Sequence, residues 1–235
     1  MLLQDKVVIV SGIGPGLGQE LSTLAAKEGA AAVVLAARTE AKLDVAEEEI
    51  NSLGLGTRVL KIATDIADPE QCRALADQTA EAFGRIDVLF NSAYDPCTYD
   101  PIEDANMDDW HRTMNVNFFG TMHLTQACVQ HMKRGDGGSV VMIATMVEHK
   151  PMAMQGGYGA SKSALRAATK HLALELGQYN IRVNSCHMGW MWGPSVETYF
   201  AWQNQVTGRT QEELIAEVAA NIPLGVIPDD GECAK

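Results

Sequence analysis

The segment at residues 6–21 constrains the fold more than any other part of the chain. Val7–Val10 are four consecutive apolar residues, a run typical of a strand buried on both faces of a parallel sheet. A glycine-rich turn follows, and from Leu17 onward the apolar residues recur with helical spacing. Such a turn brings backbone N–H groups and a helix N-terminus together, an arrangement that binds a pyrophosphate. The segment therefore predicts the first strand, turn and helix of a nucleotide-binding α/β domain.

Three glycines in this turn have separate expected roles. Gly12 permits the tight turn, Gly16 lets the backbone approach the phosphates, and Gly18 lets the helix pack closely on the strand. A plain glycine turn in a strand–helix unit would show the same triplet. The position of this triplet between a buried strand and a helix favours the nucleotide site.

Tyr158 and Lys162 form the second informative feature. They are four residues apart, about one helical turn, so they share one face of a helix. A phenol titrates near pH ~10 in water, and a neighbouring ammonium lowers that pKa, which makes Tyr a usable acid or base near neutrality. Thr145, at the end of the apolar run Val140–Ala144, offers a hydroxyl that could hold a substrate oxygen against the phenol. The pair alone is a weak signal because solvated pairs at this spacing are common, and the glycine turn strengthens it.

In these motifs the chain resembles the classical short-chain dehydrogenase/reductase (SDR) family. The turn at 11–18 matches the family's T-G-x-x-x-G-x-G, with Ser11 in place of Thr. Tyr158 and Lys162 match its Y-x-x-x-K, and Thr145 stands thirteen residues before the Tyr, where the family has its catalytic Ser. The matches follow the family's order and spacing over essentially the whole chain.

The resemblance implies a role for each catalytic residue. Tyr158 would be the general acid in reduction and the base in oxidation, and Lys162 would lower its pKa and bind the nicotinamide ribose. Thr145 would orient the carbonyl. Asn117, which follows a Trp by seven residues as the family's catalytic Asn does and is chosen over Asn115, would hold a water that relays protons to Lys162.

The same resemblance places a nicotinamide cofactor across the carboxyl ends of the strands. The residues expected to contact it are Ser11, Gly12, Gly14, Gly16, Leu17, Gly18, Arg38, Asp65, Ile66, Asn91, Ala93, Tyr158, Lys162, Met188 and Gly189. Within this set Asp65 corresponds to the family's adenine contact after the third strand. No metal is implied.

The cofactor type is indicated by the residues after the second strand. NAD-preferring members usually carry an Asp at the place of Ala37, whereas here Arg38 follows with a guanidinium fork suited to a 2′-phosphate. Arg38 could instead stack on adenine, and Pro15 stands where a second basic residue often marks NADP preference. We therefore expect NADP(H) as the favoured cofactor, with NAD(H) possible.

Apolar runs and helical patterns alternate along the chain. Strands are predicted near 6–11, 32–37, 58–63, 86–91, 138–144 and 180–185, and helices near 16–28, 40–53, 69–83, 108–134, 157–178 and 195–220. This rhythm predicts an α/β fold of the Rossmann type: a single domain over 1–235 with a doubly wound parallel sheet in three α/β/α layers. Ligands bind at the carboxyl ends of such strands, where the sequence places Ser11, Asp65, Asn91, Thr145 and Cys186.

The composition excludes several classes of function. The 235 residues carry 30 acidic and 18 basic side chains, a net charge of −12, which argues against a nucleic-acid or anionic-membrane surface. The five cysteines are scattered without a C-x-x-C, so neither a disulfide framework nor a zinc site is indicated. We see no signal peptide and no apolar run of the ~18 residues that a membrane helix needs, and we expect a cytoplasmic protein. By resemblance a homotetramer is expected, with the helices near 108–134 and 157–178 at an interface.

The segment 187–222 is rich in aromatic residues and follows the sixth strand, where the family carries a small helical substrate lobe. Trp190 and Trp192, together with Tyr94, are expected to contact substrate. A helix pair that buries its aromatics in a core would show the same composition. The rings suggest a bulky apolar alcohol or ketone.

Several residues depart from the commonest family pattern. Thr145 replaces Ser, Met188 replaces Pro, and Trp192 falls where a Thr often holds the nicotinamide. Tyr94 replaces Gly, and its ring could point toward the site or away from it. The leading interpretation is an NAD(P)(H)-dependent alcohol dehydrogenase or carbonyl reductase. A nucleotide-binding scaffold or regulatory protein that has lost turnover is the alternative from another class; a dehydratase or epimerase is disfavoured by the short chain and the turn spacing.

The last residues predict a longer natural chain. Pro228–Lys235 resembles the opening of a helix that, in the family, precedes a seventh strand paired with the sixth. We therefore expect that the C-terminal strand is missing from this sequence. Its absence should leave Ile181 and Val183 less covered and the substrate lobe poorly anchored.

Overall fold

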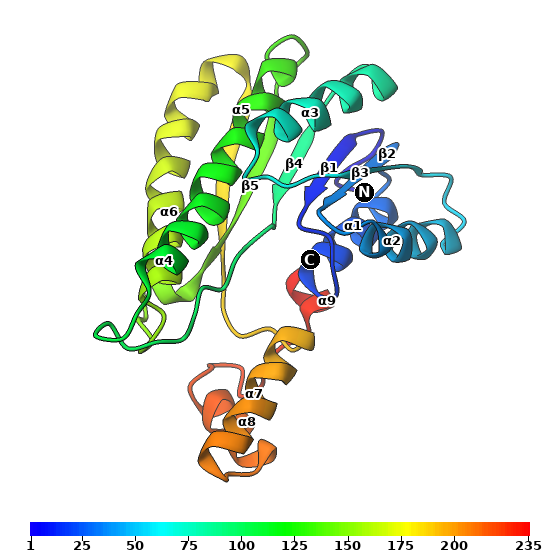
Figure 1. The fold of residues 1–235 in the computed structure, drawn as a ribbon. Coiled ribbons are helices and arrows are strands. Elements are labelled where there is room, and N and C mark those ends of the chain that lie inside the picture. Colours follow the sequence, from blue (N-terminus) through cyan, green and yellow to red (C-terminus); the bar gives the residue numbers. More distant parts are fainter.

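The computed structural model describes residues 1–235 and is built around one parallel sheet. Its strand order is β3-β2-β1-β4-β5-β6 (Figure 1). The strands are β1 (Val7–Ser11), β2 (Ala32–Ala37), β3 (Arg58–Ala63), β4 (Val88–Asn91), β5 (Gly138–Thr145) and β6 (Ile181–Met188). This confirms the predicted Rossmann-type fold. The strand order reverses between β1 and β4, so the carboxyl ends of these two strands flank the crevice where such sheets bind ligands.

Helices cover both faces of the sheet. They are α1 (Leu17–Lys27), α2 (Glu40–Ser52), α3 (Pro69–Phe83), α4 (Met107–Met114), α5 (Thr121–Met132), α6 (Gly156–Leu176), α7 (Pro194–Thr207), α8 (Gln211–Ala220) and α9 (Asp230–Cys233). Three short helical segments complete the set: the π-helix η1 (Asn115–Gly120) and the 3₁₀ segments η2 (Met146–Glu148) and η3 (Gly177–Tyr179). None of these helices is long and apolar enough to span a bilayer.

The core has two halves because successive strand residues point to opposite faces. Ile9 packs in a cluster with residues of α3, α5 and α6, whereas its neighbours Val8 and Val10 pack with residues of α1 and α2. Figure 1 shows the same two helical layers on either side of the sheet. All five residues of β1 are buried, as its apolar run predicts.

Two predicted helices are interrupted in the structure. The helix expected at 108–134 is divided into α4, η1 and α5, and its π-helical middle contains Asn117. The helix expected at 195–220 is two helices, because Gly208 ends α7 with a left-handed φ of 70° and Thr210 begins α8 as a capping box with Glu213. β6 also runs beyond the predicted end, to Met188, so Cys186 lies inside the strand instead of at its end.

The expectation that Ile181 and Val183 would be poorly covered is wrong. They are only 1% and 5% exposed. Both side chains point to the face of the sheet that α6 covers, and they belong to the same buried cluster as Leu165 and Leu176 of that helix. A further strand would pair with the backbone edge of β6, which is a different surface from this face.

The segment after β6 forms a small helical unit that extends away from the sheet (Figure 1). It is tied to the C-terminal segment by the backbone. The N–H of Trp192 donates to the carbonyl of Pro228 at 2.7 Å, and the N–H of Asp230 donates to the carbonyl of Trp192 at 3.1 Å. α9 in turn lies against α1. The lobe is thus anchored through residues 228–230, contrary to the expectation of poor anchoring.

Candidate active site

The glycine turn after β1 is hydrogen-bonded to β2 and lies close to the segment after β4. The N–H groups of Gly12 and Ile13 both donate to the carbonyl of Ala36, at 2.8 and 3.2 Å. Gly12 has a φ of 93°, and a Cβ added there would lie closer than 3.0 Å to the backbone of Ala93. A Cβ on Gly18 would lie equally close to the carbonyl oxygen of Gly12. Both positions therefore require glycine for conformation or close approach, as the predicted roles demand.

The N-terminus of α1 has the backbone features of an anion site, and the carboxylate of Asp230 lies beside it, 3.3 Å from where a Cβ of Gly16 would be. Gly16 is its N-cap, so no side chain caps the first N–H groups of the helix. Those N–H groups have no carbonyl partner within the helix, and the helix dipole favours negative charge at the same end. The turn and helix start thus have the features of a pyrophosphate site.

The predicted catalytic hydroxyls meet at the carboxyl end of β5. Thr145 is the last residue of β5, and its side chain lies beside the phenol of Tyr158, which is in the first turn of α6. Burial raises the pKa of Tyr158 to about 12, and the neighbouring Thr145 hydroxyl lowers it by a smaller amount. The phenol is therefore protonated at neutral pH in this structure.

Lys162 has a different partner from the one predicted. Its buried Nζ donates to the carbonyl of Ile143 in β5 at 2.7 Å and lies 6.0 Å from the centre of the Tyr158 ring. Burial lowers the pKa of Lys162 to about 8. The raised pKa of Tyr158 thus differs from the expectation that Lys162 would lower it, because burial dominates and the ammonium is directed at the strand.

Asn117 is brought to the same region, but its side chain is fully engaged. Its Oδ1 accepts from the backbone N–H of Asp95 at 2.7 Å. Its Nδ2 donates to the carbonyl of Asp95 and to Oγ of Ser161, both at 2.9 Å. The amide therefore joins the segment after β4 to α6, and the water relay through Asn117 stays a prediction.

Several predicted cofactor contacts lie around the crevice at the ends of β3, β4 and β6. Asn91 is buried at the end of β4, where its Nδ2 donates to Thr125 while its Oδ1 has no partner. Asp65 lies two residues beyond β3, and its Oδ1 accepts from the N–H of Ala67 at 3.0 Å. Ile66 is buried below it, while Met188 and Gly189 lie at the end of β6.

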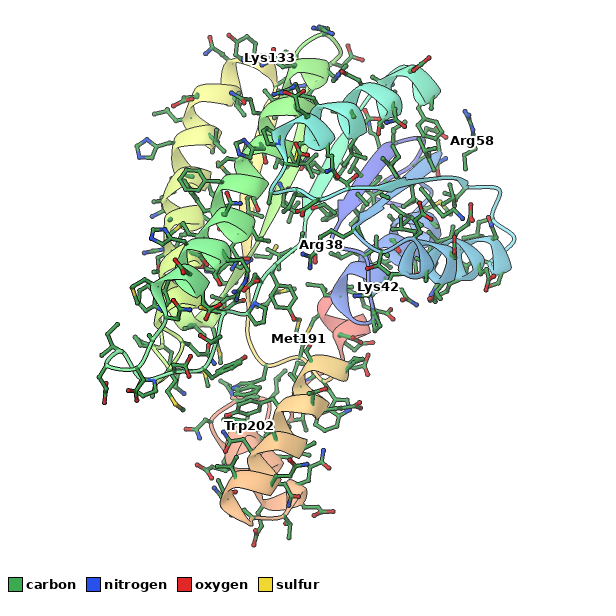
Figure 2. The ribbon with its side chains drawn as sticks, viewed as in Figure 1. Arg38, Lys42, Arg58, Lys133, Met191 and Trp202 are labelled. Carbon is green, nitrogen blue, oxygen red and sulfur yellow. The ribbon has the colours of Figure 1, made fainter.

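A second basic residue accompanies Arg38. Lys42, in the first turn of α2, lies over the glycine turn, because a Cβ on Gly14 would be 3.5 Å from its Cδ and 3.6 Å from its Nζ. In Figure 2 Arg38 and Lys42 are both on the side where α2 begins. The sequence analysis missed Lys42. Its signal was a second cation four residues after Arg38, at the start of the following helix.

Tyr94 points toward the site. Its ring is edge-on to that of Tyr158, with centroids 6.5 Å apart, and its hydroxyl lies 3.2 Å from Oγ of Ser195 in α7. The side chain thus bridges Tyr158 and the helical lobe. The sequence left open whether the Tyr94 ring points toward the site or away from it, and the structure places it toward the site.

The two tryptophans predicted to bind substrate pack inside the lobe. Trp190 and Trp192 both stack on Phe200, at centroid distances of 5.8 and 6.1 Å, and Phe200 is almost fully buried. Tyr99, from the segment after β4, contacts Tyr199 and Trp202 at 6.4 Å each. The aromatic residues therefore form both a small core and a half-exposed rim.

Comparison with known proteins decides the family. The family model described as short chain dehydrogenase matches residues 6–204. An oxidoreductase of Methylorubrum extorquens is 32% identical over 232 residues, which is 97% of this chain and 88% of that protein. Trans-4-hydroxycyclohexanecarboxylate dehydrogenase of Sinomonas cyclohexanicum is 35% identical over 79% of this chain and 72% of its own. The crystal structure of NAD+-bound xylitol dehydrogenase superposes with a TM-score of 0.92 at 27% identity, covering 100% of this chain and 91% of that one.

The chain belongs to the short-chain dehydrogenase family. It is an oxidoreductase that acts on alcohol or ketone groups. The resemblance read from the glycine turn and the Tyr–Lys pair is thereby confirmed.

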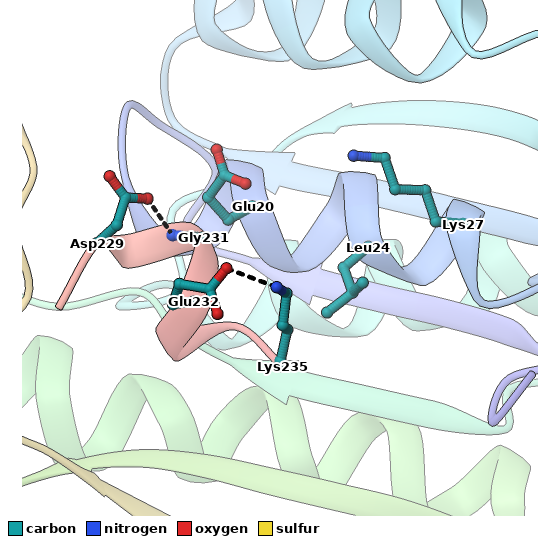
Figure 3. Close-up of a pocket in the computed structure, with 7 residues that line it drawn as sticks. All are labelled: Glu20, Leu24, Lys27, Asp229, Gly231, Glu232 and Lys235. Atoms are coloured by element: carbon teal, nitrogen blue, oxygen red, sulfur yellow. Dashed lines mark hydrogen bonds and ion pairs between the residues drawn. The ribbon is translucent and has the colours of Figure 1, made fainter.

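One pocket of this short-chain dehydrogenase lies apart from the predicted site. Figure 3 shows it between α1 and α9, with an ion pair between Glu232 and Lys235 on its wall. The lining residues are Glu20, Leu24, Lys27, Asp229, Gly231, Glu232 and Lys235. None of them is a predicted catalytic or cofactor residue, so the pocket takes no part in the reaction considered below.

We expect Thr145→Ser to retain activity and Thr145→Ala to lose most of it, because the hydroxyl is the group that meets Tyr158. The Ala variant also loses a cap on η2, since Oγ1 accepts from the N–H of Val147, and this should cost about 1 kcal/mol of stability. Thr169→Ala, which removes a buried hydroxyl outside the site, controls for that loss. Steady-state rates measure the activity of these variants, and thermal unfolding measures their stability. A fully active Ala variant would make Thr145 a strand-end residue only.

Proposed function

We propose that this dehydrogenase transfers hydride between a nicotinamide cofactor and a bulky, ring-bearing alcohol or ketone, with Tyr158 as the acid and base. The observation that carries the proposal is the placement of the Thr145 and Tyr158 hydroxyls beside each other at the carboxyl end of β5. A carbonyl oxygen placed there would receive a hydrogen bond from the Thr145 hydroxyl and a proton from the phenol. With its raised pKa Tyr158 carries its proton at neutral pH, and a bound cofactor that brings positive charge near the phenol would make it a stronger acid.

The surrounding residues fit a dinucleotide. The uncapped start of α1 and the glycines before it suit the pyrophosphate, and the unpartnered Oδ1 of Asn91 is a buried acceptor available to a ligand. When bound, the cofactor supplies the hydride, so the protein has to position it and to manage the proton. Lys162 would bind the nicotinamide ribose by exchanging its bond to Ile143. Its pKa of about 8 keeps it partly charged near neutrality.

The aromatic rim of the lobe and one relative both indicate the substrate class. The half-exposed Tyr94 faces Tyr158, and Tyr99 and Trp202 are exposed nearby in the aromatic rim. The relative from Sinomonas cyclohexanicum is named for a hydroxylated cyclohexane ring. We infer an alicyclic or aromatic ring as the preferred substituent. Cofactor oxidation with a panel of linear, alicyclic and aromatic ketones tests this; equal rates with short linear ketones would contradict it.

Arg38→Ala should weaken NADP(H) binding about ten- to a hundredfold while changing NAD(H) binding little. A charge-assisted hydrogen bond to a 2′-phosphate contributes about 1.5–3 kcal/mol. Lys42→Ala should have the same selectivity with a smaller effect, because an ammonium lacks the bidentate fork. Fluorescence titration with both cofactors measures the four dissociation constants of each variant.

Arg58→Ala is the matched control for these variants. Arg58 lies at the start of β3, where it stacks on Phe83, whereas the proposed cofactor site lies at the carboxyl ends of the strands. An equal loss of both cofactors in the Arg38 variant would indicate adenine stacking. Tighter binding of NAD(H) by the wild type would overturn the preference for NADP(H).

We also propose a homotetramer with an interface on α6 and on the helical stretch that includes η1. Leu174 on α6 is 83% exposed and Phe119 in η1 is 49% exposed, which is unusual for large apolar side chains without a partner. Sedimentation equilibrium of the wild type and of Leu174→Glu tests this, and a monomeric wild type would contradict it.

A further inference from the structure

A buried carboxylate without an assigned role lies beside the Thr145–Tyr158 pair. Glu148, the last residue of η2, has a side chain with no exposed surface. Its Oε1 accepts from the backbone N–H of Thr145 at 3.3 Å, while Oγ1 of Thr145 accepts from the N–H of Val147 at 3.3 Å. These two bonds form a capping box. Because the hydroxyl oxygen of Thr145 accepts from the backbone, its one proton is left for the phenol or for a substrate oxygen that takes the place of that contact.

Glu148 has basic neighbours on two other elements. Arg166 on α6 has its Nε 2.9 Å from Oε2, and His187 on β6 has its Nδ1 3.6 Å from Oε1. The Arg166 Nε and Glu148 Oε2 have no aligned hydrogen-bond partner, so attraction between charges holds this pair. The ring of His149 contacts that of His187 at 5.1 Å.

Glu148, His149 and His187 present their ligand atoms within 4.8 Å of one another, a spacing that could also suit a cation. The guanidinium of Arg166 already occupies one side of the carboxylate, which disfavours a metal ion there. We therefore treat the group as an ion-pair network. The sequence spacing did not reveal it, because its members come from η2, α6 and β6.

We propose that Glu148 and Arg166 form a charge pair that positions the Thr145 hydroxyl against Tyr158 and tunes the proton affinity of that phenol. This rests on the proposed role of Tyr158 as acid and base. Physically, a nearby negative charge disfavours the phenolate and a nearby positive charge favours it. The burial of Glu148 strengthens both effects, because water screens the charges less.

Other ionisable groups also face the pair. Tyr94 and Tyr99 lie toward Tyr158, and burial raises the pKa of Tyr99. His187 on β6 lies beside Glu148, and the ring of His149 contacts that of His187. Burial lowers the pKa of Lys162 on α6 to about 8, and the charge of Glu148 opposes that shift. Glu148→Gln should therefore lower the pKa of Lys162 as well, whereas Arg166→Gln leaves the charge of Glu148 in place.

The test is the pH dependence of kcat/KM for alcohol oxidation, which requires the phenolate. Glu148→Gln keeps an acceptor for the Thr145 N–H but removes the charge, so the apparent pKa of the rate should fall by about one unit. Arg166→Gln removes the compensating cation, so the same pKa should rise. Glu175→Gln, an exposed change on the same helix, should move nothing. Opposite shifts are the expected signature, because a purely structural role would not produce them.

A second arm tests positioning. Glu148→Ala removes the acceptor, so kcat should fall about tenfold with little change in KM, and Glu148→Gln should restore most of it. Unmoved pH profiles in both charge variants, or shifts in the same direction, would overturn the proposal. If Glu148→Gln fails to fold, Arg166→Gln decides alone: an upward shift supports the pair and no shift rejects it. An active Tyr158→Phe variant would instead refute the proposed function, so the two failures are distinguishable.

Discussion

Replacing Tyr158 with Phe lowers turnover by about 10²–10⁴-fold and leaves cofactor binding nearly unchanged. This is the expected result because the substitution removes only the phenolic oxygen, the group proposed to donate the proton in reduction and to accept it in oxidation. The ring itself stays, together with its edge-on contact to Tyr94. Steady-state rates in both directions and a fluorescence titration with the cofactor measure the two properties separately.

Tyr179→Phe is the matched control for this variant. Tyr179 lies in η3, where its ring contacts the ammonium of Lys133, and it has no predicted part in the reaction. That variant should keep wild-type rates. If Tyr158→Phe turned over at the wild-type rate, the catalytic assignment would be wrong and another group would have to carry the proton.

Gly18→Ala should abolish cofactor binding and destabilise the fold by about 3 kcal/mol. The added methyl would overlap the carbonyl oxygen of Gly12, and that turn cannot move away because its N–H groups are bonded to the carbonyl of Ala36. Overpacking of a rigid contact costs about 1–3 kcal/mol, and displacement of α1 also moves the N–H groups proposed to bind the pyrophosphate. Urea unfolding and cofactor titration measure both effects.

Gly177→Ala provides the comparison within the same chain. A Cβ at Gly177 meets no atom within 4 Å, and the residue has helical backbone angles at the end of α6. We expect a neutral or slightly stabilising change there, because Ala loses less backbone entropy than Gly on folding. Normal cofactor affinity in the Gly18 variant would show that the helix does not need this close approach.

Much of the fold follows from local patterns. The run Val7–Val10 predicts a strand buried on both faces, and β1 is buried throughout, because a parallel sheet has helices on both sides. Local patterns failed at two interruptions. The π-helix around Asn117 keeps the helical hydrophobic spacing, so nothing in its sequence distinguished it from α-helix. The break at Gly208 did carry a signal, a glycine followed by the capping residue Thr210, but the run of helix-forming residues on both sides obscured it.

The sequence by itself determined the family, the glycine turn and the candidate catalytic residues, because these depend on residue type and spacing along the chain. The tertiary structure decided which partners those residues have. Lys162 is bonded to Ile143 and not to the phenol, and burial raises the pKa of Tyr158, since desolvation depends on packing from several elements. Residues distant in sequence also meet only through the fold: Lys42 lies over the glycine turn, and Glu148 lies between Thr145 and Arg166.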